Sequence, residues 1–248
     1  MRIGACQTPE ILGDVDASLG VIRGFAARAD AEGVDLLLFP ECFLQGYLVT
    51  EQHVREQAWE LESGELTELA GIRPMLVLGM IERDGDRYFN TAAVVHHGRV
   101  VGRYRKTFLT AGESVFTAGD EYPVFECGGV RFGINICYDT QFPEAAGGVA
   151  ANGGQVLLVA AQNMMRRDKA FWWQGRHNEI RAQRARETGM WLASADVTGE
   201  RDSERIGLGP TCFLNPAGEV VAQVPAGVRD MVVADLAGLA GGAADGRG

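Results

Sequence analysis

Short, continuous apolar runs recur along this chain and constrain its fold more strongly than any other feature. The run "VDLLLF" at 34–39 shows no polar alternation and is stopped by Pro40, which is typical of a strand buried on both faces. The stretch before it has the spacing of an amphipathic helix, with Asp16 near the predicted N-cap and Gly33 as terminator. Its apolar positions are Leu19, Ile22, Phe25, Ala26 and Ala29. A buried strand beside a one-sided helix indicates a sheet covered by helices, the α/β class.

The same alternation continues to the end of the chain. Pro143 favours the first position of a helix that ends at "NGG" (152–154), and a long polar helix is predicted over 171–188. No Pro- or Ser-rich linker and no internal repeat interrupts the pattern. We therefore expect one domain over 1–239, followed by a disordered tail over 240–248. The other predicted strands are "RIGACQ", "MLVLGMIER", "NTAAVVHHG", "RVVGRYRK", "GVRFGINIC", "QVLLVAA", "MWLASAD", "PTCFLNP", "EVVAQVP" and "DMVVADL".

Charge and cysteine content exclude several classes of protein. The net charge of −10 leaves no basic footprint for nucleic acid or an anionic membrane. The 5 cysteines are odd in number and contain no C-x-x-C pair, unlike a secreted disulfide scaffold or a zinc ribbon. No signal-peptide core or membrane-spanning run is visible, and the 4 histidines show no metal-ligand spacing. We expect a reduced, soluble, cytoplasmic protein.

Three ionisable residues each follow a predicted strand. Glu41 comes after "VDLLLFP", Lys106 ends "RVVGRYRK" and Cys137 ends "GVRFGINIC". Ligands of α/β proteins bind beyond the carboxyl ends of strands, so these residues could converge in one crevice. Each alone also has a plainer interpretation: a solvated carboxylate, a loop lysine and a buried cysteine that fills the core.

Together the three residues suit acyl transfer. A thiol is strongly nucleophilic only as the thiolate, which requires a base or a positive field. Cys137 lies between a strand and a helix start, where unpaired N–H groups and the helix dipole favour negative charge. Glu41 could accept the thiol proton and pass it to a leaving amine. Lys106 and the main-chain N–H of Tyr138 could stabilise the oxyanion.

Three segments, "LLLFPECFLQGY", "GRYRKTFL" and "GINICYDTQFPE", resemble in this order the three catalytic motifs of the nitrilase superfamily of carbon–nitrogen hydrolases. The similarity extends from "IGACQT" through "NPAGEVVAQVP" to "MVVADL". The resemblance implies an αββα four-layer sandwich, assembled as a homodimer or larger homo-oligomer. It also implies a Glu–Lys–Cys triad that acts on a small molecule without a metal or organic cofactor.

The resemblance assigns a role to each matching residue. Glu41 is the general base and acid, Lys106 stabilises the oxyanion, and Cys137 is the nucleophile that forms a thioester acyl-enzyme. Glu113, in "LTAGESVFTAG", matches a further glutamate of the family that positions the substrate and the lysine. An exposed loop carboxylate is the alternative for Glu113.

The residues around Cys137 indicate an amide substrate. Cys137-Tyr138-Asp139, followed by "FPE", resembles the amidase branches that include omega-amidases, whereas true nitrilases carry Cys-Trp-Glu. "AAQNM" at 160–164 resembles the stretch that borders the substrate pocket of those amidases, so Gln162 and Asn163, together with Tyr47, are pocket candidates. We expect hydrolysis of an amide to a carboxylate and ammonia. N-carbamoyl compounds and nitriles are variants within the family.

Several positions depart from the family pattern and leave the substrate open. The chain has "RARET" at 184–188 where Arg-Ala-x-Glu-Asn is common, and "GPT" at 209–211 where Gly-x-Ser is common. The segment "MMRRDKAFWWQGRHNEI" is unusually long and basic. Its Arg166, Arg167 and Lys169 could meet an anionic substrate or lie in a solvated loop. Trp172 and Trp173 could wall a pocket or an interface, although burial against the sheet is the simpler interpretation.

Two other classes of function compete with this hypothesis. A papain-like pair of Cys137 and His177 lacks the Gly-Ser-Cys-Trp signature, and His177 falls in a stretch that is predicted to be an exposed helix. A catalytically silent binding or assembly module would not need all three residues of the triad. Serine-hydrolase and nucleotide-binding motifs are absent from the sequence.

Overall fold

A computed structural model describes residues 1–236, which contain the alternating strands and helices that the apolar runs predict. The predicted tail over 240–248 lies outside the described residues. The strands are β1 (Arg2–Pro9), β2 (Leu36–Leu38), β3 (Met75–Asp84), β4 (Arg87–His96), β5 (Arg99–Arg105), β6 (Val124–Cys127), β7 (Val130–Ile136), β8 (Val156–Ala160), β9 (Met164–Arg166), β10 (Trp191–Glu200), β11 (Arg205–Leu208), β12 (Cys212–Leu214), β13 (Val220–Gln223) and β14 (Asp230–Asp235). The α-helices are α1 (Val15–Ala31), α2 (Glu51–Gln57), α3 (Pro143–Ala151), α4 (Arg167–Trp173) and α5 (Arg176–Thr188). Within residues 1–236, no helix is long and apolar enough to cross a membrane.

The strands form one connected sheet in the order β5-β4-β3-β2-β1-β10-β8-β7-β6. Its centre is parallel, because β3, β2, β1, β10, β8 and β7 pair in the same direction. Antiparallel strands extend both ends, with β4 and β5 at one end and β6 at the other. β14 returns to pair with β1, so the last described strand lies beside the first.

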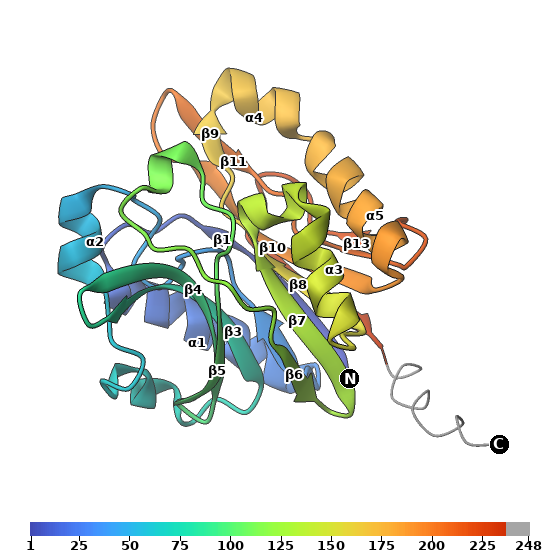
Figure 1. Ribbon diagram of the computed structural model, residues 1–248, viewed down its shortest axis with the longest axis horizontal. Coiled ribbons are helices and arrows are strands. Elements are labelled where there is room, and N and C mark those ends of the chain that lie inside the picture. The colour runs from blue at the N-terminus through green and yellow to red at the C-terminus, as the bar shows by residue number, and fades with distance from the viewer. Residues whose placement is uncertain (237–248) are drawn as a thin grey trace.

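The two halves of this sheet pack face to face, with helices on both outer surfaces (Figure 1). The first half-sheet, β1–β5 with β14, and the second half-sheet, β6–β8 with β10, β12 and β13, share a buried core. Helix α1 covers the outer face of the first half-sheet, and α3 and α5 cover the second. This arrangement is the four-layer αββα sandwich, so the predicted fold class is confirmed.

Local sequence explains where the helices begin and end. Helix α1 begins earlier than predicted, because Asp14 rather than Asp16 is the N-cap and accepts a hydrogen bond from the N–H of Ala17 at 2.9 Å. Gly33 follows the helix with a φ of +65°, the left-handed conformation that glycine adopts without a Cβ clash. Pro143 is the first residue of α3, as predicted.

The single long helix predicted over 171–188 is wrong. The structure has two helices there, α4 and α5, and Gly175 is the N-cap of the second. Glycine weakens a helix interior but is tolerated at an N-cap, which accounts for the break. The sequence analysis also missed helix α2 and the strands β6, β9 and β11; β9 and β11 pair with each other as a short antiparallel ribbon. This ribbon places Met164 and Met165 on the wall of the cavity that Glu41, Lys106 and Cys137 also line.

Candidate active site

The three predicted catalytic residues line one cavity of about 500 Å³. Glu41 follows β2, Lys106 follows β5 and Cys137 follows β7, so strands of both half-sheets contribute. The main-chain N–H of Glu41 donates to the carbonyl of Ala161, next to the end of β8, at 3.2 Å and so joins the two halves at this edge. The predicted pocket residues Tyr47, Gln162 and Asn163 line the same cavity.

Lys106 lies between two buried carboxylates. Its Nζ is 2.7 Å from Glu41 Oε1 and 2.8 Å and 3.0 Å from the two oxygens of Glu113. Glu113 is fully buried, so it is not an exposed loop carboxylate. Because all three side chains are at most 1% exposed, little water screens their charges, and the cluster behaves as one unit.

Asn90, at the start of the apolar part of β4, is a further member of the cluster that the sequence analysis missed. Its Nδ2 donates to Glu41 Oε1 at 2.7 Å and to Glu113 Oε1 at 3.1 Å. The thiol of Cys42 lies 3.3 Å from Asn90 Oδ1 and so orients the amide. The sequence feature that could have identified Asn90 is a polar amide within the apolar run "FNTAAVV", since an amide that is buried there needs hydrogen-bond partners.

The two carboxylates have different proton affinities. Burial raises the pKa of Glu41 to about 7, since it outweighs the opposing effect of Lys106, and the charge of Glu113 adds to the rise. Burial also opposes ionisation of Glu113, but Lys106 and the N–H of Thr110 hold its pKa below the ordinary value. Burial alone would lower the pKa of Lys106, yet Glu41, Cys137 and Glu113 raise it, so Lys106 stays protonated.

Cys137 is held in a sharp turn at the end of β7. Its φ of +43° is left-handed, which is uncommon for a residue with a side chain and is typical of functional sites. The thiol is partly exposed to the cavity, and its Sγ lies 3.9 Å from Asn163 Oδ1. Burial and the neighbouring Glu41 raise the pKa of this thiol, against the effects of Lys106 and the Gln162 main chain. A 3-10 helix (Cys137–Gln141) does begin at this residue, but the raised pKa means that the helix start does not favour the thiolate as expected, and a base is needed to remove the proton.

Asp139 connects the Cys137 turn to the segment that carries Lys106. It is fully buried and accepts hydrogen bonds at 2.8 Å from the N–H of Ile136 and at 2.8 Å from the N–H of Phe108. The hydroxyl of Tyr104 donates to it at 2.7 Å. Asp139 thus fixes the position of the Cys137 turn relative to the segment that carries Lys106. The sequence analysis used this residue only to distinguish amidases from nitrilases.

The predicted pocket residues have fixed orientations. The N–H of Asn163 donates to Asp196 Oδ1 at 2.9 Å, and its side chain donates to the other oxygen of the same carboxylate. The side-chain amide of Gln162 donates to Glu10. Burial, with Glu41 as a further cause, raises the pKa of Tyr47, so its phenol is neutral. These contacts make the wall of the cavity rigid before any substrate binds.

Helices α4 and α5 and strand β9 supply another part of the wall, and here several expectations fail. His177 is half-buried and lines the cavity, stacked on Trp173 with ring centroids 5.2 Å apart, instead of lying on an exposed helix face. Trp172 is 54% exposed, so its predicted burial is wrong. The other lining residues on these elements are Met164, Met165 and Arg181.

The basic residues at the end of β9 and in the first turn of α4 do not line the cavity. Arg167 pairs with Glu200 at 2.6 Å, and Arg166 lies 3.8 Å from Asp168 with 65% of its side chain exposed. Lys169 is exposed as well. Of the two interpretations of this segment, the solvated surface is the one that the structure bears out.

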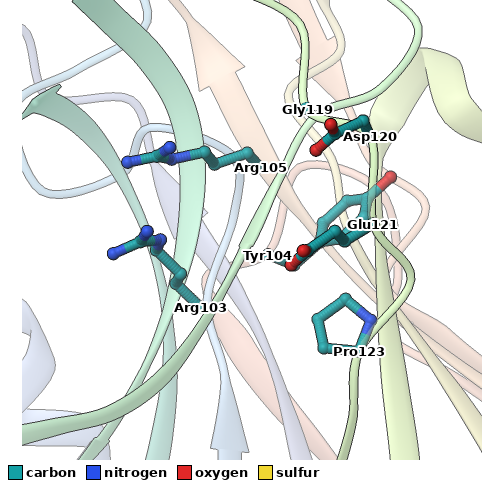
Figure 2. A pocket seen from close by; sticks show the side chains of 7 residues that line it. All are labelled: Arg103, Tyr104, Arg105, Gly119, Asp120, Glu121 and Pro123. Atoms are coloured by element: carbon teal, nitrogen blue, oxygen red, sulfur yellow. The ribbon is translucent and has the colours of Figure 1, made fainter.

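A smaller cavity of about 150 Å³ lies beside β5, as Figure 2 shows. The guanidinium groups of Arg103 and Arg105 extend away from Asp120 and Glu121 in this view. Arg105 is instead bound to Glu82 and packs over the ring of Phe89. Because this cavity lacks a nucleophile and a convergent base, the larger cavity is the candidate active site.

The fold and this cluster of side chains define a carbon–nitrogen hydrolase. The sequence pattern of the carbon-nitrogen hydrolase family matches residues 2–244, and the chain belongs to this family. A nitrilase from Pyrococcus abyssi is 29% identical over 93% of this chain and 87% of its own length. An (R)-stereoselective amidase from a Pseudomonas species is 30% identical over 90% of this chain and 81% of its own. The structure of an amidase of the nitrilase superfamily from Nesterenkonia superposes with a TM-score of 0.82 at 29% identity, covering 95% of this chain and 90% of the other.

Proposed function

We propose that this enzyme hydrolyses a small-molecule amide to a carboxylate and ammonia through a thioester on Cys137. The observation that carries the proposal is the buried cluster in which Lys106 contacts both Glu41 and Glu113, on the wall of the cavity that Cys137 lines. A cysteine beside a base of pKa about 7 suits acylation near neutral pH, because such a base both accepts and releases a proton there.

In the acylation half-reaction, Glu41 removes the thiol proton as Cys137 Sγ attacks the amide carbonyl carbon. Lys106 Nζ and the main-chain N–H of Tyr138 stabilise the oxyanion of the tetrahedral intermediate. Glu41 then delivers the proton to the nitrogen, the C–N bond breaks, and ammonia leaves. Because Lys106 and Asn90 both donate to Glu41 Oε1, we assign the moving proton to Oε2.

In the second half-reaction, Glu41 takes a proton from water while the water oxygen attacks the thioester. The oxyanion again lies at Lys106, the C–S bond breaks, and the proton on Glu41 returns to the departing sulfur. The sum is one amide and one water consumed, and one carboxylic acid and one ammonia formed. Glu113 remains ionised throughout and balances the charge of Lys106.

The relatives support a covalent cysteine mechanism. A variant of the Nesterenkonia amidase carries the acetamide moiety of fluoroacetamide, bound covalently at its active-site cysteine. Nitrile hydrolysis is the second candidate, and the Pyrococcus abyssi nitrilase favours it. The residues that follow Cys137 resemble the amidase branches, which is why we place the amide first.

A Cys–His mechanism is less suitable. Burial lowers the pKa of His177 to about 3, with the positive charge of Arg181 as a further cause, so this imidazole is a weak base at neutral pH. A binding module without catalysis would gain nothing from burying Glu41, Lys106 and Glu113 together, since each buried charge costs desolvation free energy.

Cys137→Ala tests the proposal directly. We expect ammonia release from neutral amides such as phenylacetamide to fall by at least about 10³-fold, because the nucleophile is lost. The matched control is Cys127→Ala, which removes a half-buried thiol on β6 and should keep normal activity. With a slowly hydrolysed amide, mass spectrometry of the intact wild-type protein should detect an acyl adduct that maps to Cys137. Full activity of Cys137→Ala would refute the mechanism, and hydrolysis of nitriles but not amides would refute the substrate class.

A further inference from the structure

We infer that the acyl group of the substrate is uncharged and apolar, and that the cavity discriminates against amides that carry a carboxylate on the acyl side. This inference rests on the proposed amide hydrolysis and adds the chemical class of the substrate. It differs from what the resemblance to omega-amidases suggests, because omega-amides of dicarboxylic acids carry such a carboxylate. The argument depends on which charges of the cavity wall are already paired.

Recognition of a carboxylate in a buried site requires an unpaired cation or several free donors. Lys106 and Arg181 are the cations of the cavity wall among the described residues. Lys106 is committed to Glu41 and Glu113. Arg181 is 3% exposed, donates to the carbonyl of Pro210 at 2.7 Å and lies 3.5 Å from Asp196. Apart from the oxyanion that Lys106 stabilises at the reacting carbonyl, neither cation is therefore available to a carboxylate elsewhere on the substrate.

His177 does not replace the missing cation. It lies on α5 one turn before Arg181, and burial together with that guanidinium lowers its pKa to about 3. Its ring is stacked on Trp173 at an interplanar angle of 20°. At neutral pH the pair therefore presents a flat, uncharged aromatic surface to the cavity.

The charges around the cavity also repel a further anion. Glu41, Glu113 and Asp196 are buried here, against the two cations Lys106 and Arg181. With Glu41 ionised the cluster carries a net negative charge. Burial is the main cause that raises the pKa of Cys137, and the carboxylates of Glu41 and Asp196 raise it further. A substrate carboxylate would lose its hydration and meet excess negative charge, both of which weaken binding.

Apart from the polar residues Thr110, Thr140, Gln141, Gln162 and Asn163, the remaining wall suits an apolar group. Met164 and Met165 from the β9 segment, Trp173 from α4, and Tyr47 and Tyr138 all line the cavity. Thioether and aromatic side chains bind apolar groups well, and methionine adapts to their shape. A volume of about 500 Å³ is large enough for a branched aliphatic or phenyl group next to the reacting carbonyl.

A pair of isosteric substrates tests the inference. In 4-methylpentanamide an isopropyl group occupies the place of the carboxylate of succinamate, so the two differ chiefly in charge and polarity. We expect kcat/KM of the wild-type enzyme to be about 100-fold higher for 4-methylpentanamide, with phenylacetamide also hydrolysed. A kcat/KM for succinamate equal to or above that for 4-methylpentanamide would overturn the inference while leaving amide hydrolysis intact. If neither amide is hydrolysed and Cys137 acquires no adduct, the proposed function itself fails.

Two variants locate the discrimination. Trp173→Ala should lower kcat/KM about tenfold for 4-methylpentanamide and phenylacetamide, and less for acetamide, which has little acyl group to bind. Its control is the nearby Phe171→Ala, at a side chain that is 59% exposed and absent from the cavity wall, and it should leave the three rates unchanged. Met165→Arg adds an unpaired cation and should raise the ratio of succinamate to 4-methylpentanamide hydrolysis at least tenfold. An unchanged ratio in Met165→Arg, or equal losses for all amides in Trp173→Ala, would count against this acyl site.

Discussion

At the level of single residues, the two carboxylates that flank Lys106 differ in how many donors hold them. Glu113 accepts two hydrogen bonds from Lys106, one from Asn90 and one from the N–H of Thr110. Glu41 accepts from Lys106 and Asn90 through a single oxygen. The extra donors stabilise the ionised form of Glu113, so the cluster takes up its proton at Glu41. Two identical side chains thereby acquire different functions.

The pH dependence of kcat/KM should report this difference. Glu41 must be deprotonated to act as base, and burial raises its pKa to about 7, so activity should fall about tenfold per pH unit below that value. A pH–rate profile for a neutral amide measures the position of this acid limb. A limb near the ordinary carboxyl pKa of 4.5 would contradict the assignment of Glu41 as the base.

Asn90→Asp provides a second measurement of the same property. The substitution removes a donor from Glu41 and adds a third carboxylate, both of which favour the protonated form, so the acid limb should move to higher pH by roughly one unit. Asn152→Asp, at the end of α3, is the control with no expected shift. A loss of activity without movement of the limb would mean that Asn90 is merely structural.

At the level of secondary structure, strand β3 limits how the Glu41 turn can be built. Gly79 of β3 lies against that turn so closely that an added Cβ would be 2.0 Å from the carbonyl oxygen of Pro40 and 2.8 Å from the Cα of Glu41. Cys42, the next residue along, has a left-handed φ of +46°. Glu41, the proposed general base, is therefore positioned by a glycine in the neighbouring strand, because only glycine permits this approach.

Gly79→Ala should consequently displace Glu41. We expect a large loss of kcat and a lower melting temperature, since backbone atoms rather than flexible side chains must move. Gly20→Ala in α1 is the control, because no atom lies within 4 Å of its added Cβ. That change should keep activity and stabilise the protein by about 0.5–1 kcal/mol. Normal kcat in Gly79→Ala would show that the turn is more adaptable than its contacts indicate.

At the level of the whole molecule, strand β10 joins the two half-sheets. It pairs with β1 in the first and with β8 and β12 in the second. Both half-sheets also contribute to the core between them. A strand shared in this way couples the folding of the two halves, which is the physical argument for the single domain over 1–239. That domain boundary stays a prediction, as do the homo-oligomer and the cytoplasmic location.

Thermal unfolding tests the coupling. Trp59 forms a β-bridge with Glu82 of β3, in the first half-sheet, and Trp191 is the first residue of β10, in the second. Variants that keep only one of these tryptophans should report the same fluorescence midpoint, equal to the midpoint from far-UV circular dichroism, because two-state unfolding has one transition. Midpoints that differ by more than about 5 °C would show that the half-sheets unfold separately.

Much of this fold could be predicted from local patterns. The apolar runs located β1–β5, β7, β8, β10 and the last three strands because burial of a strand is expressed in consecutive side chains. The prediction failed where local propensity was weak, as at Gly175, which separates α4 from α5, and in the short β9–β11 ribbon. The residues of the cavity wall were predicted incompletely for the same reason, since Trp173, His177 and Met165 reach the cavity from α4, α5 and that ribbon.

The sequence alone was sufficient to indicate the αββα family and the side chains Glu41, Lys106, Cys137 and Glu113, because motifs and strand ends are short-range features. It was not sufficient to show which charges are paired. Lys106 and Glu41 are 65 positions apart, and Arg181 and Pro210 are 29 apart, so these contacts exist only once the strands and helices have packed. Chain neighbours set the chemistry that a residue can perform, whereas burial and long-range partners set its protonation state and its availability to a substrate.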